Sequence, residues 1–195
     1  SRVDMPKEAK PYQRPEDSGK LSEYFAFGEI RQTEAYIREF KKVQKENGYV
    51  SWKDSLKLVR KFSPYNPTDP HNKPFLNDLR IAFIDELGFT EEKDMNRVKI
   101  FTAVGSPLDV WHGIDALIEV EDENGRTSKI IGFDAKEMAS SPETREHAHD
   151  KKADIIIFMK DIPNAETESK EYDAKMGEIA KEAGQVFKTR ESINL

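Results

Sequence analysis

The sequence contains no cysteine. This absence excludes disulfide scaffolds, cysteine nucleophiles and thiolate metal sites. No apolar run approaches the roughly 20 residues that a membrane-spanning helix needs, and the first residues show no secretory signal. The zinc-protease, P-loop and dinucleotide-binding motifs are missing as well. We therefore expect a protein without a membrane partner, located in the cytoplasm.

Hydrophobic residues are also scarce. They make up 36% of the 195 residues, whereas charged residues make up 35%. Aromatic residues still reach 10%, which is too many for a disordered chain. A chain of this length buries roughly 70% of its unfolded surface when it folds. The composition therefore predicts a compact protein with a thin core and a heavily charged surface.

The charges are unevenly distributed along the chain. The formal net charge is −6, which argues against a nonspecific polyanion binder. Residues 38–61, however, carry eight Lys/Arg against three acids, a net charge of +5, so the remainder carries −11. Such asymmetry is compatible with one basic face that binds an anion. A solvated helical face is the alternative interpretation.

Proline and helix signals divide the chain. Residues 1–20 are polar, contain three prolines and are predicted to be a flexible leader. Apolar spacing predicts helices over 21–47 and 51–62, which together form a helical N-terminal region, 21–63. Four prolines within 63–74 mark the border of this region.

Behind the border, residues 74–195 show the pattern of an α/β domain. GSPLDVW, residues 105–111, is expected to be a loop. The expected elements are a helix over 74–87, strands over 97–104, 113–121 and 128–136, a helix over 142–152, a strand over 153–159, a helix over 166–184 and a last edge strand at QVFKT, 185–189.

The second and third of these strands form a predicted hairpin. The Asn-Gly pair at 124–125 is the strongest short hairpin signal, and a two-residue turn there pairs Glu123 with Arg126. The same register places Asp115 opposite Asp134, with Cβ atoms about 4.5–5.5 Å apart. A slip of one residue would break this pairing.

The alternation along 113–121 assigns each side chain to a face. Even-numbered residues from Ile114 to Val120 face the core, whereas Asp115 shares the opposite face with Glu119 and Glu121. The two glutamates are expected to face solvent.

Two opposed carboxylates favour a cation between them. Hard divalent cations such as Mg²⁺ take oxygen ligands, often one or two carboxylates with waters and a substrate phosphate. Lys136 lies two residues beyond Asp134 on the same face of the strand. Glu86 falls inside the apolar arc of the helix 74–87 and is a candidate third acid, unless it extends to solvent. An ordinary exposed hairpin, with its acids balanced by Lys136, is the alternative.

Gly113-Ile114-Asp115, then a hairpin, then Asp134-Ala135-Lys136, followed by a helix and an apolar strand, resembles the PD-(D/E)xK nuclease superfamily. This superfamily includes restriction endonucleases and junction resolvases. The resemblance covers residues 74–159. It implies an α/β fold with a restriction-endonuclease-like α-β-β-β-α-β core, here behind a helical N-terminal region. One departure is that no proline directly precedes Asp115, and Asp109 in Pro107-Leu108-Asp109 is the alternative.

The resemblance also implies a function, namely a DNA endonuclease that depends on Mg²⁺, with Mn²⁺ as a substitute. Asp115 and Asp134 match the metal-binding acids, and Lys136 matches the lysine that orients the attacking water. Glu86 would be the auxiliary acid of the first core helix and a metal ligand. The Ala135 carbonyl would be a further ligand.

DNA is the partner that this reading implies, and a homodimer is left open. The rival reading is a catalytically silent nucleic-acid-binding or protein-interaction module on the same fold. Candidate nucleic-acid contacts come from the basic helices and the loop before the second strand: Lys41, Lys42, Lys57, Arg60, Lys61 and His112.

Overall fold

The computed structural model describes residues 18–148 and 152–193. The first 17 residues of the predicted leader, and residues 149–151 of the predicted helix 142–152, lie outside the described residues. Within the described residues, no helix is both long and apolar enough to cross a bilayer.

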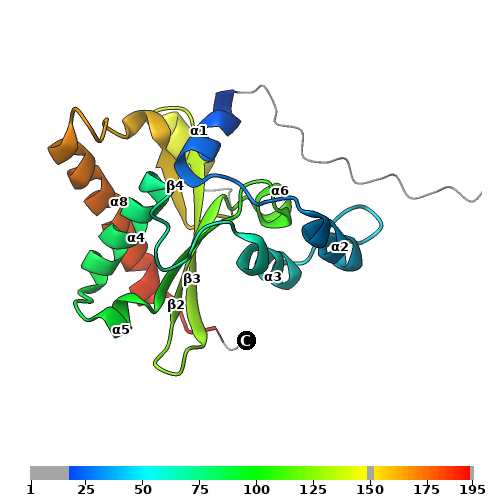
Figure 1. Cartoon of the computed structure of the whole chain (residues 1–195). Helices are drawn as coiled ribbons and strands as arrows, with labels where there is room; N and C mark the ends of the chain where they lie inside the picture. Colours follow the sequence, from blue (N-terminus) through cyan, green and yellow to red (C-terminus); the bar gives the residue numbers. More distant parts are fainter. Residues whose placement is uncertain (1–17, 149–151, 194–195) are drawn as a thin grey trace, which may run out of the picture.

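A four-stranded mixed sheet forms the centre of the molecule (Figure 1). The strands lie in chain order, with the first three antiparallel and the last parallel to the third. The α/β class predicted from the sequence is confirmed at this level. The strands are β1 (Val98–Thr102), β2 (Ala116–Glu121), β3 (Thr127–Lys136) and β4 (Ile155–Phe158).

Helices cover both faces of the sheet (Figure 1). Helices α4 (Pro74–Leu87) and α8 (Ser169–Thr189) pack on the face that carries Ile118. Helices α2 (Glu34–Val43), α3 (Trp52–Phe62) and α6 (Pro107–His112) lie on the face that carries Leu117. The remaining elements are α1 (Ser18–Phe27), α5 (Glu92–Met95), α7 (Pro142–Ala148) and the 3₁₀ turn η1 (Met159–Asp161).

Because both faces are covered, the prediction that Glu119 faces solvent is wrong. Glu119 is 2% exposed and lies on the same face of the sheet as Leu117. Ile114 also differs from its prediction, since it belongs to the hydrophobic cluster of Leu117 rather than to that of Ile118. Alternation shows which residues share a face, but not whether a helix covers that face.

The single helix predicted over 21–47 is two helices. Gly28 has φ 68, a left-handed conformation in which α1 ends, and its backbone packs so closely on the Tyr65 ring that a side chain would collide with it. Thr33 then caps α2 by accepting a hydrogen bond from the Tyr36 amide at 3.2 Å. Apolar residues keep helical spacing across this break, so the apolar pattern does not reveal where α1 ends.

The predicted loop GSPLDVW contains the short helix α6. The Ser106 hydroxyl accepts a hydrogen bond from the Leu108 amide, Pro107 occupies the first helical turn, and Gly113 ends the helix at φ 65. The edge strand predicted at 185–189 is likewise wrong, because α8 continues to Thr189. Phe187 in these last turns packs edge-on against Phe83 of α4.

The predicted hairpin register is correct, although its turn is not. The turn spans three residues, 123–125, since the Asp122 amide donates to the Arg126 carbonyl at 2.7 Å. A bulge between Val120 and Glu121 shifts the pairing by one residue. The two departures cancel, so that Ala116 pairs with Phe133 in the expected register.

Gly132 in β3 is required by close packing. A Cβ atom there would lie 2.3 Å from Cδ1 of Ile114, the residue just before Asp115. We expect Gly132→Ala to lower the free energy of unfolding by about 1–3 kcal/mol, the usual cost of overpacking a core. Ile114→Val removes the obstructing Cδ1, so the double variant should regain part of this loss in urea unfolding. Equal losses with and without Ile114→Val would contradict the steric explanation.

Candidate metal centre

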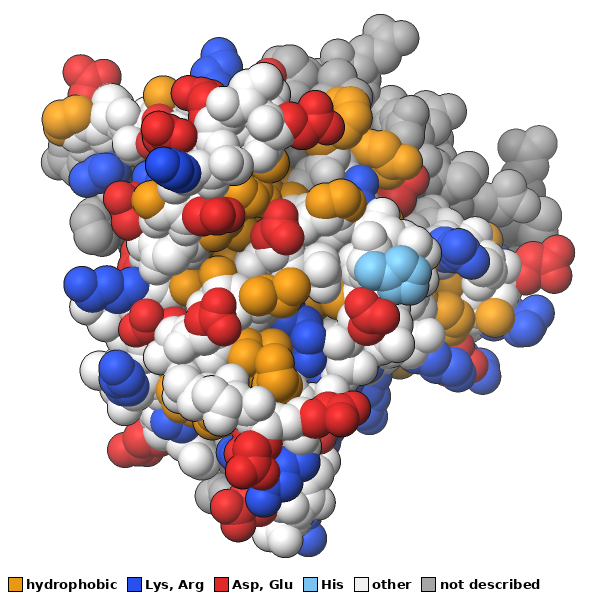
Figure 2. Space-filling model, turned by 60° about the vertical axis from the view of Figure 1, so that its left-hand side comes forward, with side chains coloured by type: hydrophobic (Ala, Val, Ile, Leu, Met, Phe, Trp, Pro, Cys, Tyr) orange, Lys and Arg blue, Asp and Glu red, His pale blue; other side chains and the backbone are white. Residues whose placement is uncertain are grey.

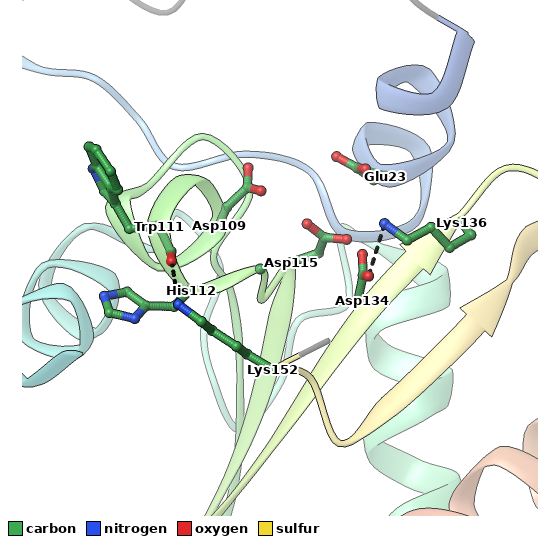
Figure 3. A pocket seen from close by; sticks show the side chains of 9 residues that line it. Glu23, Asp109, Trp111, His112, Asp115, Asp134, Lys136 and Lys152 are labelled. Carbon is green, nitrogen blue, oxygen red and sulfur yellow. Dashed lines mark hydrogen bonds and ion pairs between the residues drawn. The ribbon is translucent and has the colours of Figure 1, made fainter. Parts of the chain in front are cut away.

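A cavity of about 360 Å³ opens where the N-terminal end of β2 meets the C-terminal end of β3. Helix α1 and helix α6 contribute the other walls, as Figure 3 shows. Its charged lining consists of four acids and two lysines: Glu23, Asp109, Asp115, Asp134, Lys136 and Lys152.

Backbone hydrogen bonds fix Asp115 between two strands. Its amide donates to the Phe133 carbonyl at 2.8 Å, and its carbonyl accepts from the Ala103 amide at 2.7 Å. The side chain is held as well, because Oδ2 accepts a hydrogen bond from the Ala135 amide at 2.8 Å. Asp115 is 2% exposed, so its carboxylate has little contact with solvent.

Three carboxylates from separate elements meet in this cavity. One oxygen each from Glu23 of α1, Asp109 of α6 and Asp115 lies within 4.8 Å of the others. Figure 3 shows the three side chains directed into the same space. The Gly105 amide orients Asp109 by donating to its Oδ2 at 2.9 Å.

Burial, together with the neighbouring charges of Asp109, Glu23 and Asp134, raises the pKa of Asp115 to about 10. The hydrogen bond from the Ala135 amide opposes this rise. A carboxyl group in this position is stable only when a proton or a cation neutralises it. The cavity therefore favours either a protonated Asp115 or a bound cation.

Asp134 and Lys136 form the opposite side of the cavity. Asp134 is 4% exposed, and its Oδ2 lies 2.9 Å from the Lys136 ammonium. Lys136 is thereby held at the cavity, with 27% of its side chain exposed. The structure thus brings together Asp115, Asp134 and Lys136, as predicted, with the Ala135 backbone between them. The predicted role of the Ala135 carbonyl as a ligand stays a prediction.

Glu86 does not belong to this cavity. It lines a separate groove between α4 and α8, beside Asp78 and Asp85. Figure 2 shows this face, where hydrophobic side chains lie among acidic ones. The Glu86 side chain packs over Gly184 of α8, where an added Cβ would lie 2.7 Å from Glu86 Cγ. The structure therefore does not bring Glu86 together with Asp115 and Asp134.

Two predicted nucleic-acid contacts have partners within the fold, one of them half-buried and the other buried. Arg60 forms an ion pair with Glu119, with Nη2 and Oε1 2.6 Å apart. His112 is 6% exposed, and its Nε2 lies 2.9 Å from the Val50 carbonyl, so this nitrogen is the donor. Lysines at the other predicted positions are exposed, and their contact with DNA stays a prediction: Lys41, Lys42, Lys57 and Lys61.

The sequence reasoning missed Glu23 and treated Asp109 as an alternative to Asp115. Both Asp109 and Asp115 face the cavity, because α6 turns the chain between them. Glu23 was missed because α1 and α2 were predicted as one helix. A sequence signal for Glu23 was the glycine that ends α1, since a separate short helix is free to pack on β3.

The donor set fits a hard divalent cation. Glu23, Asp109 and Asp115 offer carboxylate oxygens, which Mg²⁺ and Mn²⁺ prefer, and the cluster contains no sulfur or imidazole ligand. Asp134 lines the same cavity.

Three comparisons with known proteins, against family models, curated proteins and solved structures, find no match for the chain.

Proposed function

We propose that the protein is a Mg²⁺-dependent endonuclease that hydrolyses phosphodiester bonds in DNA. The observation that carries this proposal is the meeting of Asp115, Asp134 and Lys136 with two further acids in one cavity. A D…DxK pattern alone is common in a chain so rich in charge. Its placement on two paired strands, around a cavity, is a stronger argument.

The arrangement of elements supports a restriction-endonuclease-like core. Three antiparallel strands in chain order are followed by helix α7 and by β4, which pairs parallel to β3. This is the β-β-β-α-β order that the resemblance implies. Helix α1, which carries Glu23 and packs against β3, would be the first core helix rather than α4.

Glu23, Asp109, Asp115 and Asp134 would hold the Mg²⁺ ion. A bound divalent cation supplies Lewis-acid stabilisation of the phosphate and lowers the pKa of a coordinated water. The backbone contacts of Asp115 keep its carboxylate oriented toward the cavity. These contacts fix the Asp115 carboxylate before substrate binds.

Lys136 would orient the attacking water and the substrate phosphate. Its ammonium is fixed by Asp134 at 2.9 Å, which limits the directions in which it donates hydrogen bonds. In the hydrolysis, the water oxygen bonds to phosphorus, one P–O ester bond breaks, and the products are a phosphomonoester and an alcohol. The proton lost by the water balances the proton gained by the leaving oxygen.

A metal-dependence experiment tests this proposal. Supercoiled plasmid, linear duplex, single-stranded and branched DNA are incubated with the protein in Mg²⁺, Mn²⁺ or EDTA. We expect cleavage with either metal and none in EDTA. Calorimetry should also detect Mn²⁺ binding, and Asp115→Asn should weaken this binding by at least 10-fold.

Glu123→Gln is the matched control for the binding experiment, because it removes one negative charge from the exposed hairpin turn. It should bind Mn²⁺ as the wild type does. If the wild type neither binds Mn²⁺ nor cleaves any of the four substrates, the nuclease proposal fails. The silent binding module on the same fold would then replace it.

A further inference from the structure

Three aromatic side chains gather around His112 beside the cavity and are here called the aromatic platform: Tyr49, Trp52 and Trp111. The chain contains two tryptophans, and both belong to this platform. Trp52 is 40% exposed and Trp111 is 37% exposed. Tryptophan is normally well buried, so two exposed copies at one place point to a binding role.

Helix α6 links the platform to the acidic cluster. Asp109 in its first turn joins the three carboxylates, and Trp111 near its end lines the same cavity as Asp115. Figure 3 shows Trp111 at the side of the cavity away from Glu23 and Lys136. Trp111 lies four positions before Asp115, so their Cα atoms are at most roughly 14 Å apart, no more than about four base steps at the duplex rise.

The rings of the platform are held in place. The Trp111 Nε1–H donates a hydrogen bond to the Gly48 carbonyl at 3.1 Å, and Tyr49 packs edge-on against Trp111 at 5.5 Å. Trp52 packs edge-on against the buried His112, also at 5.5 Å. Rings fixed in this way lose little conformational entropy when a planar ligand stacks on them.

Lysines surround the platform. The Lys45 ammonium lies 5.5 Å from the centre of the Tyr49 ring, and Lys152 donates to the Trp111 carbonyl at 3.1 Å. Lys53 follows Trp52 and is exposed. Aromatic faces flanked by cations match a ligand that alternates planar bases with phosphates.

We propose that the aromatic platform stacks unpaired bases of single-stranded DNA next to the cleavage site. This inference rests on the proposed nuclease function and names the substrate class of that site. In a duplex the base faces are covered by their neighbours, so an exposed ring stacks only on a strand that is already unstacked. The platform therefore selects single strands, flaps or unpaired junctions over intact duplex.

Tryptophan fluorescence tests the platform directly, because Trp52 and Trp111 are the only tryptophans in the chain. The wild-type protein in EDTA is titrated with a mixed-sequence 20-nucleotide DNA strand, with its duplex and with the RNA strand of the same sequence. We expect the DNA strand to quench the fluorescence and to bind at least 10-fold more tightly than the duplex. Absence of quenching, or equal affinity for strand and duplex, would overturn the proposal. RNA binding as tight as that of DNA would overturn the choice of DNA.

Variants separate stacking from structural effects. Trp111→Leu keeps an apolar side chain but removes the ring, and should weaken single-strand binding by about 5- to 150-fold, measured by anisotropy of a labelled strand. Trp111→Phe should restore part of the affinity. Ile81→Ala, which truncates an exposed apolar residue on α4, is the control and should leave the affinity unchanged. If Trp111→Leu fails to fold, Trp52→Leu provides the same comparison at the start of α3.

The same titration distinguishes the two proposals. Asp134→Ala should still bind and be quenched by single-stranded DNA in EDTA, since Asp134 is not part of the platform. Quenching without metal-dependent cleavage would refute the nuclease and leave the platform standing. Metal-dependent cleavage of duplex and single strand at equal rates, without quenching, would refute the platform and leave the nuclease standing.

Discussion

Replacing Asp134 with alanine is expected to abolish metal-dependent cleavage, with a loss on the order of 1,000-fold or more. Asp134 lines the cavity with the three clustered carboxylates and also fixes the Lys136 ammonium at 2.9 Å. Its removal therefore costs both a metal ligand and the positioning of Lys136. The loss is measured as the rate of cleavage of the preferred substrate at saturating Mg²⁺. Unchanged cleavage by Asp134→Ala would show that the assigned site is wrong.

The same substitution should not destabilise the protein in the absence of metal. Asp134 is one of the acids whose charge opposes ionisation of the buried Asp115. Lys136, which loses its ion pair with Asp134, has 27% of its side chain exposed and is solvated in the variant. We expect the melting temperature of Asp134→Ala in EDTA to equal or exceed that of the wild type. This result separates loss of function from loss of fold, and it is typical of sites where function opposes stability.

The sequence predicted the register of the two strands that carry the site correctly. Two errors, one in the length of the turn and one in the missing bulge, cancelled each other. The Asn-Gly signal indicated a two-residue turn, whereas the turn has three residues, 123–125, and the bulge at Val120 and Glu121 restores the register. Register is strongly specified because a slip of one residue would exchange the two faces and place Glu119 against α4 and α8, away from Arg60. The hydrophobic pattern, rather than the turn, therefore determined the pairing.

The residues that the sequence did not predict depend on contacts between distant elements. Glu23 reaches the cavity because α1 packs on β3, and Gly28 marks where α1 ends but not what it packs against. Glu119 was expected in solvent because nothing in its strand indicates that α3 covers it. The helix that carries its partner Arg60 was predicted, but its packing on the sheet was not. This one contact explains the error at Glu119, whereas contact of Arg60 with DNA stays a prediction.

Replacing Arg60 with methionine is expected to lower the free energy of unfolding by about 3 kcal/mol at pH 8. Arg60 neutralises Glu119, whose side chain is 3% exposed, and its Nε donates to Oε1 at 2.6 Å. Without Arg60, a buried carboxylate is left without its cationic partner. Urea unfolding measures the loss, and Lys61→Met, an exposed neighbour on α3, should change stability by about 0.5 kcal/mol or less. If both substitutions have equally small effects, the ion pair does not stabilise the fold, and Arg60 is again a candidate DNA contact.

The pH dependence of Arg60→Met identifies Glu119 as the cause. Burial raises the pKa of Glu119 above its ordinary value of 4.5, and Arg60 opposes this rise. In the variant, the folded-state pKa of Glu119 rises further, so the folded protein binds a proton that the unfolded chain releases. Stability therefore falls as the pH increases from 4.5 through the raised pKa, and the loss relative to wild type should shrink toward pH 5.

The double variant Arg60→Met/Glu119→Leu removes both charges and should recover most of the wild-type stability at pH 8, without this pH dependence. A loss that is the same at pH 5 and pH 8, or a double variant no more stable than Arg60→Met, would show that the ion pair is not the reason.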